Sequence, residues 1–300
     1  FLISLNSFSS DLGTVGLIDI PSARMMNDGD LNFSFNTQKI ANSANISYQA
    51  FPWLETTFRY TIFNPDNPNR NSIYPDGLND RSYAVKFKIL EEKRYIPQLA
   101  IGIRDLLGTG AWGSEYVVAS KKISNFDINI GLGWGRLAER QSFKNPMSIL
   151  SNKFESRLNN DEIVGGLNGG KLRSSSFFSG DKVGIFGGIS YKFDRLNTEF
   201  LLEYNSDSYA RERRLGTIKD ASPISIGMKW YPSKNLIFGV SYQQNNQVGL
   251  SLSSKLGTKK NSNWKKPNTS RSLLDTDSFS IRAKELNINS WYDRLLFDLE

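Results

Sequence analysis

The sequence predicts an all-β fold, a transmembrane antiparallel β-barrel of about twelve strands, with ten to sixteen compatible with the pattern. Three observations predict this class. Apolar and polar residues alternate in many short runs, aromatic residues gather at the ends of those runs, and short connections alternate with long ones. The mean hydropathy of -0.41 fits a barrel, because only every second residue of a barrel strand faces lipid. No stretch approaches the ~20 consecutive apolar residues of a spanning helix.

Alternation with a period of two defines the candidate strands. In the third run, for example, Leu54 and Phe58 lie on one face, and Glu55 and Arg59 lie on the other. The twelve runs are 31–37, 44–48, 54–62, 83–89, 99–103, 115–120, 126–134, 183–191, 198–204, 224–230, 238–242 and 248–252.

Aromatic residues and connection lengths favour a membrane barrel over a soluble sandwich. Trp53, Trp134 and Trp230 stand at strand ends, where barrels carry aromatic girdles. Tight turns at 51–53, 124–125, 194–197 and 232–235 alternate with long segments at 64–81, 135–182 and 205–223. If the N-terminus is periplasmic, every tight turn is periplasmic and every long loop is external. An even strand number then returns the chain to the periplasm, so we predict an outer-membrane location with both termini periplasmic.

Three segments are expected along the chain. Residues 1–30 form an N-terminal arm, which is either a possible lumen plug or the remnant of a signal peptide. Residues 31–255 form the outer-membrane barrel. Residues 256–300 form a linker and the start of a periplasmic segment, because 256–277 is polar, 279–283 is compatible with one more strand, and 290–299 has helical spacing.

Composition excludes several kinds of chemistry. The chain has no cysteine and no histidine, so thiol chemistry, zinc–thiolate sites and serine–histidine catalysis are ruled out. We predict no enzyme activity, no cofactor and no metal. The net charge of +7 is scattered, apart from lysines at 259, 260, 265 and 266, and is read as a solvated face rather than a nucleic-acid site.

Two segments are neither strand-like nor ordinary loop. The first contains Gly16-Leu-Ile-Asp-Ile-Pro21-Ser-Ala-Arg24, and the second contains Arg104-Asp105-Leu-Leu-Gly108-Thr-Gly110 followed by Glu115-Tyr116-Val-Val-Ala-Ser120-Lys121. Together with Gly131-Leu-Gly-Trp134-Gly-Arg136, they resemble the YjbH-type family of outer-membrane proteins. The resemblance is good over residues 13 to 137. It implies a barrel associated with exopolysaccharide biosynthesis and export, and it supplies no catalytic residue.

The same motifs also have a purely physical interpretation. Gly-Thr-Gly between two strands is a turn in which glycine supplies a positive φ. The charged residues near it are expected to form an ion-pair network, or else to line a path for a hydroxyl-rich chain. Residues 13–29 either fold into the lumen or lie beneath the barrel, with Arg24 paired to a lumenal carboxylate. The candidate lumen or ligand residues are Arg24, Arg59, Arg104, Asp105, Glu115 and Arg136.

The leading hypothesis is a non-enzymatic outer-membrane barrel in exopolysaccharide export or surface polysaccharide assembly. The expected partners are outer-membrane lipid, a polysaccharide chain and periplasmic export proteins, but no nucleic acid. The alternative is a general small-solute porin, with 135–182 as its constriction loop. An outer-membrane lipid hydrolase and a soluble carbohydrate-binding module are two further classes. The missing histidine counts against the hydrolase, and the need for detergent during extraction would separate the module.

Overall fold

The structure is a computed structural model of the 300-residue chain. It describes residues 9–39, 41–63, 79–108, 110–157, 176–214, 218, 221–244 and 247–257. The predicted signal remnant at the N-terminus, the lysine cluster, and the predicted strand and helix of the last 42 residues lie outside these ranges.

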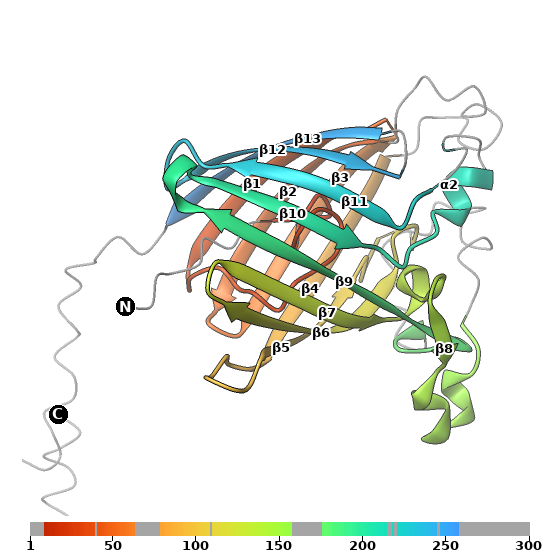
Figure 1. Ribbon diagram of the computed structural model, residues 1–300. Coiled ribbons are helices and arrows are strands. Elements are labelled where there is room, and N and C mark those ends of the chain that lie inside the picture. The colour runs from red at the N-terminus through yellow and green to blue at the C-terminus, as the bar shows by residue number, and fades with distance from the viewer. Residues whose placement is uncertain are drawn as a thin grey trace, which may run out of the picture. The chain divides into compact units, whose positions relative to one another are not determined.

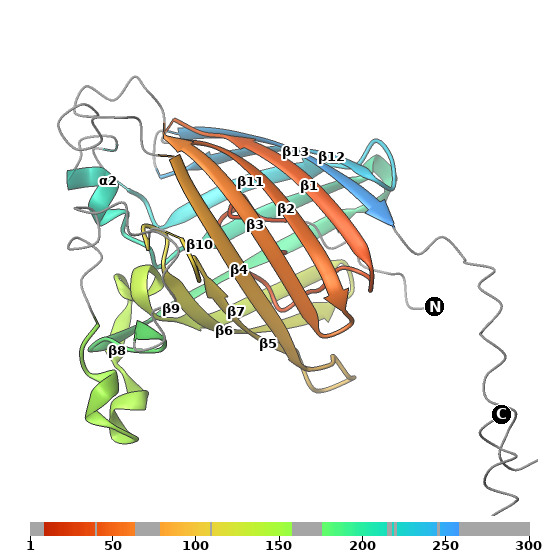
Figure 2. The same ribbon diagram turned by 180° about the vertical axis from the view of Figure 1, so that it is seen from behind.

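Twelve antiparallel strands close into a ring, as the sequence predicts (Figures 1 and 2). The ring closes where β1 pairs with β13, with Asp30 opposite Gly257 and Thr37 opposite Leu250. Its strands are β1 (Asp30–Thr37), β2 (Ala41–Phe51), β3 (Leu54–Phe63), β4 (Asn79–Leu90), β5 (Gln98–Arg104), β6 (Ser114–Ile123), β7 (Phe126–Gly133), β9 (Lys182–Phe193), β10 (Thr198–Tyr204), β11 (Ile224–Trp230), β12 (Leu236–Gln243) and β13 (Gln247–Gly257).

The two ends of the ring differ in their connections. The turns β2–β3, β4–β5, β6–β7, β9–β10 and β11–β12 lie at the end where β1 begins and β13 finishes, which we call the short-turn end. The connections β3–β4, β7–β9 and β10–β11 lie at the opposite, long-loop end. This arrangement follows the parity predicted from connection lengths, because an even number of antiparallel strands returns the chain to its starting end.

Burial along the strands is the reverse of that in a soluble protein. On β7, inward-facing Asn129 is 3% exposed, whereas its outward-facing neighbour Ile130 is 60% exposed. Polar side chains buried on the inner face include Asn32, Ser47, Gln49, Glu55, Lys86, Ser120 and Glu203. Large apolar side chains exposed on the outer face include Phe35, Ile46, Ile62, Phe200, Ile226 and Leu250. An apolar outer band around a polar interior is the distribution that a lipid environment requires.

Aromatic side chains form stacked pairs near the short-turn end. Trp53 lies 5.3 Å from Phe51 and 6.1 Å from Phe87 between ring centroids, and Trp230 lies 5.8 Å from Phe238. Such rings suit the level of lipid headgroups, where one edge is apolar and the other is wet. Trp53 and Trp230 match the aromatic girdle expected from the sequence, whereas Trp134 is buried and donates to Asn145, so it does not belong to a girdle.

The connections contain more structure than the sequence predicted. A short extra strand, β8 (Ser142–Lys144), pairs with the first residues of β9, and the helices η1 (Gly135–Ala138), η2 (Pro146–Ile149) and η3 (Asn152–Phe154) flank it. Helix η6 (Asp194–Leu196) occupies the β9–β10 turn, and α2 (Ala210–Arg214) lies in the β10–β11 loop. Three residues carry too little alternation for β8 to be recognised in advance. No helix in the described residues is both long enough and apolar enough to cross a membrane.

Candidate functional site: a plugged lumen

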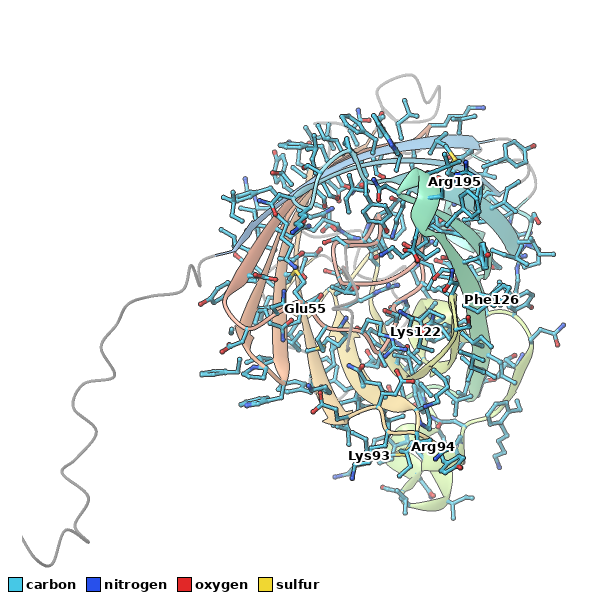
Figure 3. The ribbon with its side chains drawn as sticks, turned by 60° about the vertical axis from the view of Figure 1, so that its left-hand side comes forward. Glu55, Lys93, Arg94, Lys122, Phe126 and Arg195 are labelled. Carbon is cyan, nitrogen blue, oxygen red and sulfur yellow. The ribbon has the colours of Figure 1, made fainter. Side chains whose placement is uncertain are left out.

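Residues 9–29 lie inside the ring of strands, and we call this segment the plug (Figures 1 and 3). Bridges Ser9–Val15 and Gly16–Pro21 fold it into compact turns. Gly16 is required there, because a Cβ at this position would lie 2.2 Å from the carbonyl oxygen of Ile20. Four apolar residues of the plug pack with Tyr116, Phe186 and Leu201 of the wall. These plug residues are Leu17, Ile18, Ile20 and Ala23. The plug thus fills part of the lumen with an apolar cluster that it shares with the wall.

The carboxylate of Glu203 on β10 receives three successive backbone N–H groups of the plug. Its Oε2 accepts from Ile18 at 2.9 Å, from Asp19 at 2.9 Å and from Ile20 at 3.1 Å. A buried irregular segment must find partners for its backbone groups, because an unsatisfied buried N–H is costly. One wall carboxylate therefore satisfies an entire turn of the plug.

Lys86 on β4 performs the complementary role for the plug's carbonyl groups. Its fully buried ammonium group lies 2.7 Å from Glu55 Oε2 and donates to the carbonyl oxygens of Val15 at 3.1 Å and Arg24 at 2.7 Å. Glu55 Oε1 accepts from the N–H of Val15 at 2.7 Å. This wall pair therefore binds two points of the plug, and Figure 3 shows Glu55 on the inner side of the wall.

Arg24 anchors the plug near the short-turn end. Its Nε and Nη2 each donate to Asp127 at 2.8 Å in a bidentate pair, and its Nη1 lies 2.5 Å from Glu92 Oε2. Bidentate guanidinium–carboxylate pairs are the stronger and more directional ion pairs. The structure places Arg24 against a carboxylate of the lumen wall, as expected if the segment enters the lumen.

Arg104 and Arg59 lie in the half of the lumen nearer the long loops. Arg104 donates to the carbonyl oxygen of Asp19 at 2.8 Å, and Tyr209 donates to the Asp19 carboxylate at 2.5 Å. Arg59 lies 3.4 Å from Asp80 and 5.0 Å from the ring of Trp112. The tip of the plug is therefore held by the wall and by the loops together.

Arg136, Asp207, Glu212 and Trp112 join three loops at the long-loop end, and we call them the loop latch. Arg136 lies 2.7 Å from Asp207 and 2.8 Å from Glu212, with its guanidinium carbon 4.4 Å from the Trp112 ring centroid. Burial alone would lower the pKa of Arg136, but the charges of Asp207 and Glu212 outweigh it and hold that pKa well above its usual value. The latch therefore joins the β5–β6, β7–β9 and β10–β11 connections at these four residues.

Asp105 and Glu115 fix the backbone beside the latch. Asp105 has a φ of 59°, and its Oδ2 accepts from the N–H of Trp112 at 2.9 Å. Burial raises the pKa of Asp105 to about 6, with a smaller contribution from the charge of Asp80. Glu115 accepts from both terminal nitrogens of Arg157, at 2.6 and 3.0 Å. Within the Gly-Thr-Gly turn, Gly110 has the expected positive φ, at 79°.

The six residues singled out from the sequence do not form one site. Arg59, Arg104 and Asp105 line one small cavity. The guanidinium groups of Arg59 and Arg136 both lie over the ring of Trp112. Glu115 follows on the adjacent strand, whereas Arg24 lies apart, near the short-turn end. Their assignment to ligand binding stays a prediction. Sequence reasoning did not single out Glu203 or Lys86, although an isolated charge at an inward-facing position of a predicted strand is a usable signal.

Little space remains beside the tip of the plug. A cavity of about 30 Å³ lies between Leu12, Thr61 and Trp112, and a cavity of about 10 Å³ lies between Leu12, Arg59 and Arg104. Such volumes accommodate one or a few waters and no sugar ring. Nε of Arg59, Nε of Arg104 and Nε1 of Trp112 have no hydrogen-bond partner among the described residues. In the plugged state, these cavities therefore suit bound water.

Replacing Arg136 with alanine is expected to free the loops at the long-loop end. The change leaves Asp207 and Glu212 buried without their partner, which typically costs about 3–5 kcal/mol. We expect faster limited proteolysis within residues 205–223 and an unchanged barrel by circular dichroism. Arg213→Ala is the control, because Arg213 is exposed on α2, the short helix that carries Glu212. Equal cleavage rates in the two variants would contradict the latch.

The closed ring, its apolar outer face and its filled polar interior define a transmembrane β-barrel of the outer-membrane type. The model of the YjbH family, described as exopolysaccharide biosynthesis protein YbjH, matches residues 8–288. The chain belongs to this family. It is 32% identical over 239 residues to the uncharacterized lipoprotein YjbH of Escherichia coli (strain K12), covering 79% of this chain and 33% of that protein. It therefore spans about a third of this curated relative.

Solved porin structures share the barrel architecture at low sequence identity. The KdgM porin aligns with a TM-score of 0.39 and 8% identity, over 75% of this chain and 97% of the porin. The NanC porin aligns with a TM-score of 0.38 and 11% identity, over 76% of this chain and 99% of the porin.

Proposed function

We propose that this chain is a non-enzymatic barrel that takes part in exopolysaccharide export or surface polysaccharide assembly, and that its plug makes it a gated conduit. The family's description as an exopolysaccharide biosynthesis protein supports the link to exopolysaccharide. The observation that carries the gating proposal is the plug, whose backbone is bound by Glu203 and Lys86 of the wall. Hydrogen bonds of this kind can be exchanged for water or for hydroxyl groups when the plug leaves.

The wall behind the plug favours a hydroxyl-rich solute. Several strands contribute neutral amide and hydroxyl side chains to the lumen, including Asn32, Asn45, Ser47, Gln49, Gln98, Ser120, Asn129 and Gln243. Such groups donate and accept hydrogen bonds equally, as sugar hydroxyls do. The charged wall residues Glu55 and Lys86 already neutralise each other at 2.7 Å. An opened lumen would therefore offer many neutral hydrogen-bonding groups, together with the charges of Glu203, Asp127 and Arg104 that now bind the plug.

We place the short-turn end in the periplasm and the long-loop end outside. Short periplasmic turns and long external loops are the general pattern of outer-membrane barrels. In this orientation Asp30, where the plug joins β1, lies at the periplasmic end, and export proteins act on the plug from that side. The loop latch closes the external side.

A gene deletion with complementation tests the proposed function. Loss of the full-length protein is expected to reduce secreted polysaccharide, and the wild-type gene is expected to restore it. Unchanged secretion in the deletion strain would contradict the proposal. Steady ion conductance of the wild-type protein in planar bilayers would instead favour the small-solute porin.

A further inference from the structure

A hydrogen-bonded loop projects sideways from the long-loop end of the barrel. It comprises residues 142–155, with β8, η2 and η3, and we call it the overhang. In Figures 1 and 2 it extends below the ring of strands beside β8, and the rotated view of Figure 3 also shows it beyond the wall. The overhang thus lies to the side of the ring of strands and not over its opening.

Asn145 holds the overhang in one conformation. Its buried side chain accepts from Trp134 Nε1 and from the N–H of Met147, each at 3.0 Å. Its Nδ2 donates to carbonyl oxygens of Phe178 at 3.0 Å and Gly180 at 2.8 Å. A side chain with both ends satisfied in this way fixes the turns around it. The exposed residues of the overhang are therefore presented by a fixed support.

Those exposed residues are unusually apolar. Ile149 is 86% exposed and Leu150 is 73% exposed, side by side at the end of η2. Phe143, 42% exposed, lies opposite Val183 in the pairing of β8 with β9, so it shares the face of lipid-facing Ile185. Val183 itself is fully buried, so Phe143, Ile149 and Leu150 form an exposed apolar surface of the overhang beside the wall.

Exposed lysines flank this apolar surface. Lys144 lies opposite Lys182 in the same strand pairing, and Lys153 lies on η3. Two exposed carboxylates, Glu155 after η3 and Asp181 before β9, lie among them, so the lysines exceed the carboxylates by one. Aliphatic side chains next to lysines match a lipid interface, in which acyl chains lie beneath anionic phosphates.

We propose that the overhang is a membrane anchor that binds the lipid leaflet at the long-loop end. Ile149 and Leu150 enter the acyl region, while Lys144 and Lys153 contact lipid phosphates. If the orientation proposed above holds, this is the outer leaflet. The anchor itself requires neither that orientation nor polysaccharide export, because it depends only on the overhang's position beside the lipid-facing wall.

Single cysteines provide a direct test, since the chain has none of its own. A cysteine in place of Leu150 is labelled with an environment-sensitive dye in the barrel reconstituted into phosphatidylcholine vesicles with or without phosphatidylglycerol. We expect a blue-shifted emission, quenching by acyl-brominated lipid, and loss of iodide quenching. A label at Ile130, 60% exposed on the barrel wall, is the lipid reference, and one at Tyr95, 83% exposed in the β4–β5 turn, is the aqueous reference.

The lysines are tested in the same vesicles. Combining Lys144→Glu with Lys153→Glu is expected to weaken the quenching by brominated lipid at position 150 when phosphatidylglycerol is present, and to leave the reference at Ile130 unchanged. The proposal would be overturned if iodide quenched the fluorescence of the label at position 150 as strongly as that of the label at position 95. That outcome would instead assign the apolar tip to a protein partner, and it would leave the proposed function intact.

Discussion

Removal of residues 9–28 is expected to turn a closed barrel into an open pore. The wild-type protein should give little steady current in a planar bilayer, because the plug fills the lumen and leaves cavities of about 30 and 10 Å³ beside its tip. The deletion variant should raise single-channel conductance on the order of tenfold or more, since a twelve-strand ring without its plug encloses a hydrated lumen. Heat-modifiable migration on a gel would verify that the variant is folded.

Glu203→Ala provides a second route to the same result. The variant keeps every residue of the plug but removes the carboxylate that accepts from the N–H groups of residues 18–20. Each buried N–H group left without an acceptor costs about 1–3 kcal/mol. We expect brief openings and faster amide exchange at these residues. Glu199→Ala is the matched control, because Glu199 lies on the same strand and accepts from Tyr231 instead. A folded deletion variant that does not conduct would contradict the gating role.

Replacement of Lys86 with alanine is expected to cause a large loss of stability. It leaves Glu55 charged, fully buried and without its cation, and it removes the donor to two plug carbonyl groups. Breaking a buried ion pair in this way costs about 3–5 kcal/mol. The free energy of unfolding is measured by urea titration in vesicles, with tryptophan fluorescence as the signal.

Two further variants separate the charge from the fold. Lys86→Met combined with Glu55→Gln removes both charges, so most of the lost stability should return. Lys234 is exposed in the β11–β12 turn, so Lys234→Ala is the control. It should change the free energy of unfolding by less than ~0.5 kcal/mol. If Lys86→Ala and Lys234→Ala had the same effect, the buried pair would not stabilise the plugged barrel.

The motif residues that resemble the family illustrate how far sequence reasoning reached. The pattern around Arg24 predicted either a plug or an arm, with Arg24 on a lumenal carboxylate, and the structure pairs Arg24 with Asp127. The Gly-Thr-Gly turn was predicted from glycine conformation, and Gly110 has a φ of 79°. The sequence offered no basis for Trp112 as the point where Arg59 and Arg136 meet, since this contact depends on how three loops pack.

Strand ends were the least predictable part of the fold. The run at 83–89 extends in the structure to Asn79 and Leu90, and the run at 248–252 extends to Gln247 and Gly257. The added residues are mostly polar or flank turns, so they weaken the alternation that identifies a strand. Backbone pairing with the neighbouring strand, rather than side-chain pattern, sets these ends.

The sequence alone determined the barrel class, its twelve strands and which connections share an end of the ring, because each follows from local alternation and from parity. Only the tertiary structure decided which charges meet. Arg24 and Asp127 are 103 residues apart, and Glu203 and Ile18 are 185 residues apart. Such pairs depend on which wall positions face the plug once the ring has closed. That depends on strand register and on the path of an irregular segment, and neither leaves a periodic signal in the sequence.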